Sequence, residues 1–466
     1  MAAADTGVGA KKKSWLKRAA IGGGVGLVVL VAGGYVLIPI IASARAPGII
    51  ESAAADSIAG SVKVASASVG WGGPVTVKGL ELRDPEGKLV GSFDLESSLG
   101  IWRVLGGLSD LGTAKVSGRI DVVRTVNASG TATTNLERAL AGKTPAAPKG
   151  PKGSGGAIVL PPMSLSLDVN GIDATYTEKD SAGAEVGRAA MKQLKGSVVV
   201  SMAGTATAKV QLGAEFGETL DGPMTGSLKA AASVDGFVQG GALAAEKASV
   251  DATIDAKGAP INLIDALAGQ GGLLSSALGK TADASVKVKG TLAALDADLQ
   301  LASPNATADL GIKSDGVGAD SRVRATRKGT LALKSLAFVE RVPSVAAALT
   351  GAGVSITRWP GATVSIDSLD VPTGGERSQW SGARLEVSAM TSGDVVGTIT
   401  RTGADGAAGA PEALVVRQVT LGVIAKDLVK GVDVIGFTGA TIGGQSAGEL
   451  DLNVQVSELI GADGKL

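Results

Sequence analysis

A serine flanked by glycines is the first residue of this sequence that could do chemistry. Gly444-Gln445-Ser446-Ala447-Gly448 matches the G-x-S-x-G pattern of a nucleophile elbow, where a strand-turn-helix places the serine beside a general base. The chain has no histidine to serve as that base, and residues 449–456 alternate like a strand where the motif needs a helix. We therefore expect a glycine-rich hairpin turn here.

Two Gly-Lys-Thr triplets are candidates for phosphate binding. A phosphate loop needs a glycine five positions before the second glycine, because its backbone N–H groups wrap around the phosphates. Leu274 occupies that position ahead of Gly279, and Glu137 occupies it ahead of Gly142. Neither triplet therefore predicts a nucleotide site, and no acidic calcium-loop pattern occurs in the chain.

The composition excludes several classes of protein. Among 466 residues there is no cysteine and no histidine, which removes thiolate and imidazole metal sites and the usual catalytic bases. The 44 basic residues balance the 44 acidic ones, and only 3% of residues are aromatic, so nucleic-acid binding by charge and base stacking is not expected. We predict a protein that is not an enzyme and carries no cofactor and no metal.

Period-two alternation dominates the chain from residue 61 onward and predicts a mostly β fold. Ala208, Val210, Leu212, Ala214 and Phe216 fall on one face of a strand, with Lys209, Gln211 and Glu215 opposite. The same pattern recurs at residues 248–254, 284–288, 299–301, 364–366, 385–389 and 450–456. One apolar and one polar face per strand is typical of antiparallel sheets with a single dry side.

Few helices are expected, and all of them are short. The candidates are Pro47 to Ile58, Leu99 to Leu105, Asn135 to Leu140, Pro260 to Leu278 and, more weakly, Val423 to Val429. Pro260 suits the first turn of its helix, whereas Gly269, Gly271 and Gly272 predict a break into two pieces.

An apolar segment from about Ala19 to Ile41 predicts a transmembrane anchor. About 23 residues at 1.5 Å each reach roughly 34 Å, enough to cross a bilayer with some tilt. Five basic residues precede the segment and only Arg45 lies close after it. By the positive-inside rule residues 1–18 are a cytoplasmic tail and the bulk of the chain is translocated. A cleaved signal peptide ending at Ala42-Ser43-Ala44 is the alternative, although the apolar segment is longer than signal peptides usually carry.

Low-complexity stretches suggest how the translocated part is divided. Residues 142–160 contain a Pro, Gly and Lys-rich run that predicts a linker or long loop, and residues 402–411 predict an exposed hairpin tip. We expect β regions over 42–141, 161–316 and 317–466, with the helix near 260–278 inside the central one.

The order of elements after the anchor resembles a known family. Gly72 to Gly87, Ser98 to Leu105, Val116 to Arg124 and Thr134 to Glu137 follow one another in a pattern similar to the N-terminal region of AsmA-like proteins. This group includes TamB and the wider bridge-like lipid-transfer proteins. The likeness covers about residues 50–140, continues more loosely to about residue 315, and rests on apolar spacing and turns. The chain is shorter than expected for the family and unusually rich in Ala and Gly.

The resemblance implies a periplasmic β-groove, anchored in a bacterial inner membrane, that holds lipid acyl chains and supports outer-membrane biogenesis. It implies no catalytic residue. Phospholipid or another acyl-chain lipid, the membrane and envelope proteins are the expected partners.

The residues themselves are compatible with an antiparallel, bent sheet around an open trough, because small inward side chains leave room for acyl chains. The expected lipid-facing residues are Val210, Leu212, Val250, Ile254, Val286 and Val288. About 25 strands at 4.8 Å would give a groove of roughly 120 Å if they formed one ladder. The alternative is a structural scaffold of filled β-sandwiches that tethers envelope components. Composition does not separate the two, and the resemblance favours the groove.

Overall fold

The structure, a computed structural model, describes residues 46–456 apart from 70–73, 99–109, 127–131, 143–163, 203–205, 240–241, 244–246, 268–272, 292, 317–320, 337–346, 348, 373–381, 402–408 and 428–430. The predicted anchor, the helix at Leu99 to Leu105 and nearly all of the predicted linker lie outside these residues. None of the helices within them is long and apolar enough to span a membrane.

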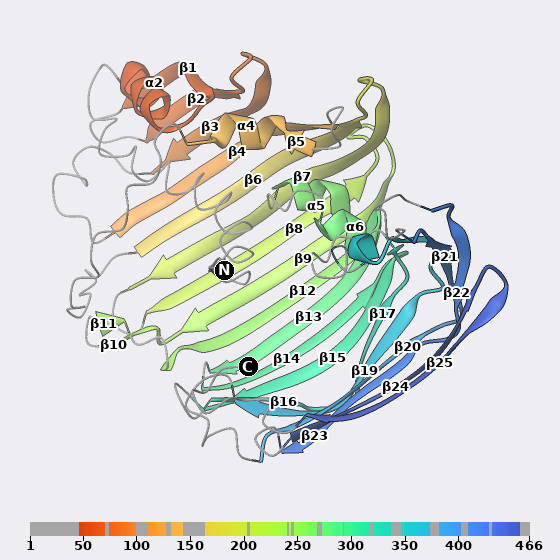
Figure 1. Cartoon of the computed structure of the whole chain (residues 1–466). Helices are drawn as coiled ribbons and strands as arrows, with labels where there is room; N and C mark the ends of the chain where they lie inside the picture. Colours follow the sequence, from red (N-terminus) through yellow and green to blue (C-terminus); the bar gives the residue numbers. More distant parts are fainter. Residues whose placement is uncertain are drawn as a thin grey trace, which may run out of the picture.

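The chain is mostly β, as predicted, and most of its strands belong to one large mixed sheet that Figure 1 shows as a continuous curved surface. Its first section comprises α2 (Ala46–Ser57), β1 (Ser61–Val69), β2 (Val75–Arg83), β3 (Leu89–Ser97), β4 (Asp110–Val126), β5 (Ala132–Thr134) and α4 (Asn135–Leu140).

The central section carries the longest run of regular strands. It comprises β6 (Ser164–Lys179), β7 (Glu185–Ser201), β8 (Thr207–Gly217), β9 (Met224–Asp235), β10 (Val238–Gln239), β11 (Ala242–Leu243), β12 (Ser249–Pro260), α5 (Ile261–Leu267), α6 (Leu273–Leu278), β13 (Thr281–Thr291), β14 (Ala294–Ala302) and β15 (Ala306–Asp315). From β6 to β15, strands next to each other in the large sheet pair antiparallel, and β10 and β11 form a separate small hairpin.

The last section contains shorter strands. It comprises β16 (Arg322–Ala325), β17 (Gly329–Leu333), β18 (Val354–Arg358), β19 (Ala362–Pro372), β20 (Arg384–Thr391), β21 (Val395–Ile399), β22 (Glu412–Val416), β23 (Thr420–Asp427), β24 (Gly431–Ile442) and β25 (Gln445–Val456). The predicted hairpin tip at 402–411 falls between β21 and β22, which pair antiparallel. Most of that tip lies outside the described residues.

One pair of strands departs from the predicted antiparallel arrangement. β4 and β6 run parallel, with Val116 opposite Val169 and Ile120 opposite Ala174. Between them the chain forms β5 and α4 before β6 begins, so it re-enters the sheet in the same direction. A crossover of this length is what a parallel pair requires.

The ladder is shorter than the strand count suggested, because several strands share one position. β16 and β17 both pair with β15 and with β19, so they are two pieces of one interrupted strand. In the same way, β22 and β23 both pair with β24 and share one position in the ladder. On their other side, β23 pairs with β20 and β22 pairs with β21. About 17 steps of 4.8 Å remain between β1 and β25, or roughly 80 Å along the sheet.

The helices agree with most of the predictions. α2, α4 and the pair α5 and α6 lie where the sequence indicated, and residues 268–272, which contain the predicted glycine break, separate the last two. The predicted helix at Val423 to Val429 is wrong, because residues up to Asp427 belong to β23. Val423 lies between Val387 and Val434 of the neighbouring strands, and this cross-strand pairing outweighs a weak helical pattern.

Candidate functional site

The six residues predicted to face lipid lie together on one face of the sheet. Val210 and Leu212 are on β8, Val250 and Ile254 on β12, and Val286 and Val288 on β13. β9, between β8 and β12, contributes Ala230 and Ala232 to the same face. We call this side of the sheet the apolar face and the opposite side the polar face.

Hydrogen-bonded register aligns these residues in rows that cross the strands. The first row is Leu212, Ala230, Ile254, Val286, Leu299 and Leu310, from β8 to β15. The second row is Val210, Ala232, Ala252, Val288, Ala297 and Ile312. Val250 lies in a third row between Val234 and Gly290. Two unbroken rows of apolar side chains therefore run perpendicular to the strands.

The apolar face continues into the last section of the sheet. Ala308 on β15 is followed across the strands by Leu331, Val364, Ala389 and Leu421. A parallel row joins Ile366, Val387, Val423, Val434 and Val454. The face thus extends over most of the ladder and is not confined to one pocket.

Much of this face is open to solvent. Ile254 and Ile312 are 41% and 42% exposed, and Leu421 and Val454 are 39% and 41% exposed. The other five predicted residues, Val210 among them, are half-buried. In a filled sandwich a second sheet would bury such side chains, but the described residues contain no second large sheet.

Helices cover the apolar face at one end of its strands, and Figure 1 shows α5 and α6 lying over the strands there. Leu263 and Ala266 of α5 pack into a buried cluster with Tyr176, Phe216 and Ala256. This cluster is the main core of the central section. The helices therefore close one end of the apolar face.

Buried polar groups hold α5 against the sheet. Arg124 of β4 and Glu178 of β6 form an ion pair at 2.6 Å, with side chains 14% and 18% exposed. Asn262 of α5 donates a hydrogen bond to Glu178 at 3.4 Å, and the carboxylate of Asp265 accepts the N–H of Leu274 in α6 at 2.7 Å. These contacts tie both helices and two strands into one unit.

Tyr176 lies within this unit and is 1% exposed. Burial and the nearby negative charge of Glu178 raise the pKa of Tyr176 to about 12. Its hydroxyl has no hydrogen-bond partner among the described residues. A perturbed group under a helix can mark a catalytic site. The described part of the chain holds no cluster of acidic residues that could bind a metal, and we interpret Tyr176 as a packing residue of this unit.

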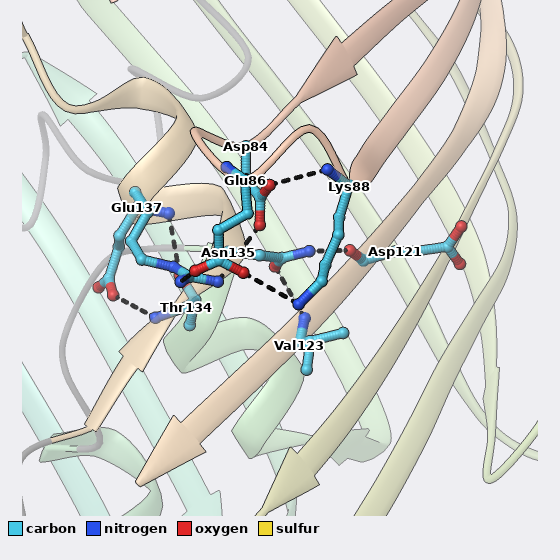
Figure 2. A network of polar contacts seen from close by, with 9 residues as sticks. Asp84, Glu86, Lys88, Asp121, Val123, Thr134, Asn135 and Glu137 are labelled. Atoms are coloured by element: carbon cyan, nitrogen blue, oxygen red, sulfur yellow. Dashed lines mark hydrogen bonds and ion pairs between the residues drawn. The ribbon is translucent and has the colours of Figure 1, made fainter. Parts of the chain in front are cut away.

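Figure 2 shows a second polar network, which joins the β2–β3 turn, β4 and the start of α4. The carboxylate of Asp84, 1% exposed, accepts the N–H groups of Glu86 and Lys88 at 3.0 and 2.9 Å and pairs with Arg138 of α4 at 3.3 Å. Arg138 also pairs with Glu86. Hydrogen bonds and the charges of Lys88 and Arg138 lower the pKa of Glu86.

The start of α4 is fixed in the same network. Thr134 and Glu137 form a reciprocal capping box, with hydrogen bonds of 3.0 and 2.8 Å. Asn135 accepts the N–H of Val123 and donates to the carbonyl of Asp121, both at 2.8 Å. The two terminal nitrogens of Arg138 pair with Asp84 and Glu86, whereas its buried Nε has no hydrogen-bond partner among the described residues. These residues hold the β2–β3 turn, β4 and α4 together.

The structure also shows where the Gly444 to Gly448 motif lies, which the sequence predicted to be a hairpin turn. Gly443 and Gly444 form the turn between β24 and β25, and Ser446 lies in β25 opposite Thr441. The predicted hairpin is confirmed. Sequence reasoning did not single out β9, where Leu228, Ala230, Ala232 and Val234 alternate with Lys229, Ala231 and Ser233, because Ala231 blurs the apolar and polar alternation.

Comparison with known proteins adds no identification: no family model, curated protein or solved structure matches this chain.

Proposed function

We propose that this protein binds the acyl chains of lipids along the apolar face of its curved sheet. The observation that carries the proposal is the pair of unbroken apolar rows from β8 to β15, partly exposed and covered by helices at one end only among the described residues. A soluble surface rarely keeps a contiguous apolar strip of this size without a ligand or partner.

A comparison of the free energy of burying CH₂ groups with the cost of association favours a lipid with more than one acyl chain. Each buried CH₂ contributes about 0.8 kcal/mol, so ten of them give at most about 8 kcal/mol. Association costs on the order of 4–15 kcal/mol before any net affinity remains. One partly enclosed chain would therefore bind marginally, whereas the two chains of a phospholipid can lie side by side across adjacent rows. The alanines on β9, β12 and β14 leave space above the sheet for them.

The cellular setting is part of the same proposal. The apolar segment from Ala19 to Ile41 would anchor the protein in a bacterial inner membrane with residues 1–18 in the cytoplasm. The sheet would then lie in the periplasm as an AsmA-like groove that carries lipid for outer-membrane biogenesis. The resemblance over residues 50–140 supports this setting.

A scaffold that tethers envelope components is the second candidate. It fits the absence of cysteine, histidine and recognisable catalytic motifs equally well. It is less favoured because a scaffold of sandwiches would bury Ile254 and Val286 between two sheets, whereas Ile254 is 41% exposed.

The test is lipid mass spectrometry on the full chain purified from membranes in mild detergent. We expect co-purified phospholipid in the wild type and its loss in the double variant Val250→Asp with Ile254→Asp. The matched control is Gln211→Asp with Gln300→Asp, which adds the same charge at exposed positions of the polar face.

Circular dichroism on the same samples separates the two candidates. Partly exposed positions tolerate a carboxylate, so the double variant should keep its strand spectrum while losing lipid. Burying two unpaired carboxylates in a filled core would cost several kcal/mol and unfold the region. A folded variant with unchanged lipid, or a wild type that carries none, would contradict the lipid proposal.

A further inference from the structure

The two edges of the large sheet are built differently. At one edge, α2 lies beside β1, and the carboxylate of Glu51 accepts the N–H of Val64 at 2.9 Å. Ile58, just after α2, forms an isolated bridge with Gly142. At the other edge, β25 pairs with β24 and with no other strand among the described residues. One edge is therefore blocked by the chain itself, whereas the other presents backbone groups that no strand of the described residues pairs with.

The open edge has a long regular stretch. β25 is twelve residues long and contains no proline, and it pairs with β24 without a register shift over residues 448–456. Glu449, Asp451, Asn453 and Gln455 lie on its polar face and are exposed. Within the described part of the chain, Glu449 forms a long, exposed ion pair with Arg417 at 3.8 Å, and such pairs contribute little to stability. Another strand could therefore pair here at little cost to the contacts that β25 makes among the described residues.

The sequence of β25 is complementary to itself in one antiparallel register. With a twofold axis perpendicular to the sheet at position 452, Asp451 faces Asn453 of the second copy, and Glu449 faces Gln455 of the second copy. Each carboxylate then meets an amide that can donate a hydrogen bond to it. Positions 450 and 454, Leu and Val in the sequence, face each other on the apolar side.

Other registers are less favourable. An axis at position 451 would place Asp451 opposite itself, and an axis at 450 would place it opposite Glu449. Like charges directly opposite each other destabilise a strand pair. An axis at 453 leaves Glu449 without an amide partner inside the strand. Of these four registers, the one centred on 452 avoids opposing like charges and gives both carboxylates an amide partner.

We propose that two copies of this protein pair through β25 in this register and form a twofold symmetric dimer with one continuous sheet. An axis perpendicular to the sheet keeps the two apolar faces on the same side, so their rows follow one another across the new strand pair. The pairing depends on backbone and polar contacts and does not require that lipid be bound.

The absence of native cysteine makes the register directly testable. Single cysteines are placed in the full chain, in membranes, at each position from 449 to 455, and disulfide-linked dimer is measured on non-reducing gels. Leu452→Cys should give the highest yield, because its Cβ atom would lie about 5 Å from its symmetry mate. Each step away from 452 adds about 7 Å to the separation, so the yield should fall several-fold by positions 450 and 454.

Two variants that introduce opposite charges at position 453 test the same contact without cross-linking. Asn453→Asp places one carboxylate opposite each of the two Asp451 side chains in the dimer and should weaken association roughly tenfold, measured by sedimentation in detergent. Asn453→Lys, at the same exposed position, pairs opposite charges and should dimerise at least as well as the wild type. A monomeric wild type, a cross-linking maximum at another position, or equal effects of the two variants would overturn the proposal.

Discussion

Ile254 and Val286 are direct cross-strand neighbours on the apolar face, although the α5–α6 excursion separates them in sequence. β12 runs toward the two helices and β13 returns from them, so the helices sit at the turn of a wide hairpin. The strands that line the face and the helices that close its end are therefore one continuous segment of chain. Substitutions in α5 should therefore also affect the strands that line the apolar face.

The small side chains of the apolar face should be needed for lipid binding. Ala232 lies between Val210 and Ala252 in the second row, and Phe at this position would occupy the space above the row. We expect Ala232→Phe to lower co-purified phospholipid several-fold while the strand spectrum is kept. Ala231→Phe is the matched control, because residue 231 is exposed on the polar face of the same strand. Equal lipid content in the two variants would contradict this prediction.

The buried ion pair between Arg124 and Glu178 should stabilise the closed end of the face. Glu178→Gln removes the carboxylate that pairs directly with the Arg124 guanidinium, at a site where both side chains are less than 20% exposed. We expect a loss of roughly 3 kcal/mol in the free energy of unfolding, measured in urea. Arg188→Gln removes the exposed pair with Glu185 at 2.7 Å and should cost less than about 1 kcal/mol. A similar small loss for both variants would show that the buried pair does not hold the helices.

Alkaline pH should destabilise the protein through Tyr176. Its pKa is about 12 in the folded protein and about 10 when unfolded, so only the unfolded state loses the proton between these values. The stabilisation is complete below pH 10 and is lost progressively as pH rises to 12, by roughly 3 kcal/mol in total. Unfolding measured across this range should show a steeper decline for the wild type than for Tyr176→Phe. Identical slopes would mean that the phenol titrates normally.

The capping box of α4 should contribute measurably to stability. Thr134→Ala removes the hydroxyl that accepts the N–H of Glu137 at 3.0 Å and should cost about 1 kcal/mol. Thr134→Ser keeps the hydroxyl and should stay within a few tenths of the wild type. Thr133→Ala, one residue earlier and exposed, controls for loss of a threonine from this strand. If Thr134→Ala and Thr133→Ala had equal effects, the cap would not be important.

The sequence by itself determined which residues share a face, because alternation at period two is a local property of a strand. Ala208 to Phe216 lie in β8 and Val250 to Ile254 lie in β12 with the predicted apolar sides, and α4 begins at Asn135 where the sequence indicated. The hairpin at Gly443 and Gly444 was equally local, because glycine is the residue that adopts the positive φ of 59° and 81° found there.

Only the tertiary structure decided which strands are neighbours and in what register. Nothing in the sequence near Leu212 indicates that Ala230 separates it from Ile254, or that β4 and β6 run parallel, because long-range backbone hydrogen bonds fix these relations. Val423 shows the same limit, since its neighbours Val387 and Val434 make it part of a strand. Arg124 and Glu178 are 54 residues apart and become partners only when β4 and β6 align. Local periodicity sets the face of each strand, whereas the order of strands depends on contacts that form only in the folded chain.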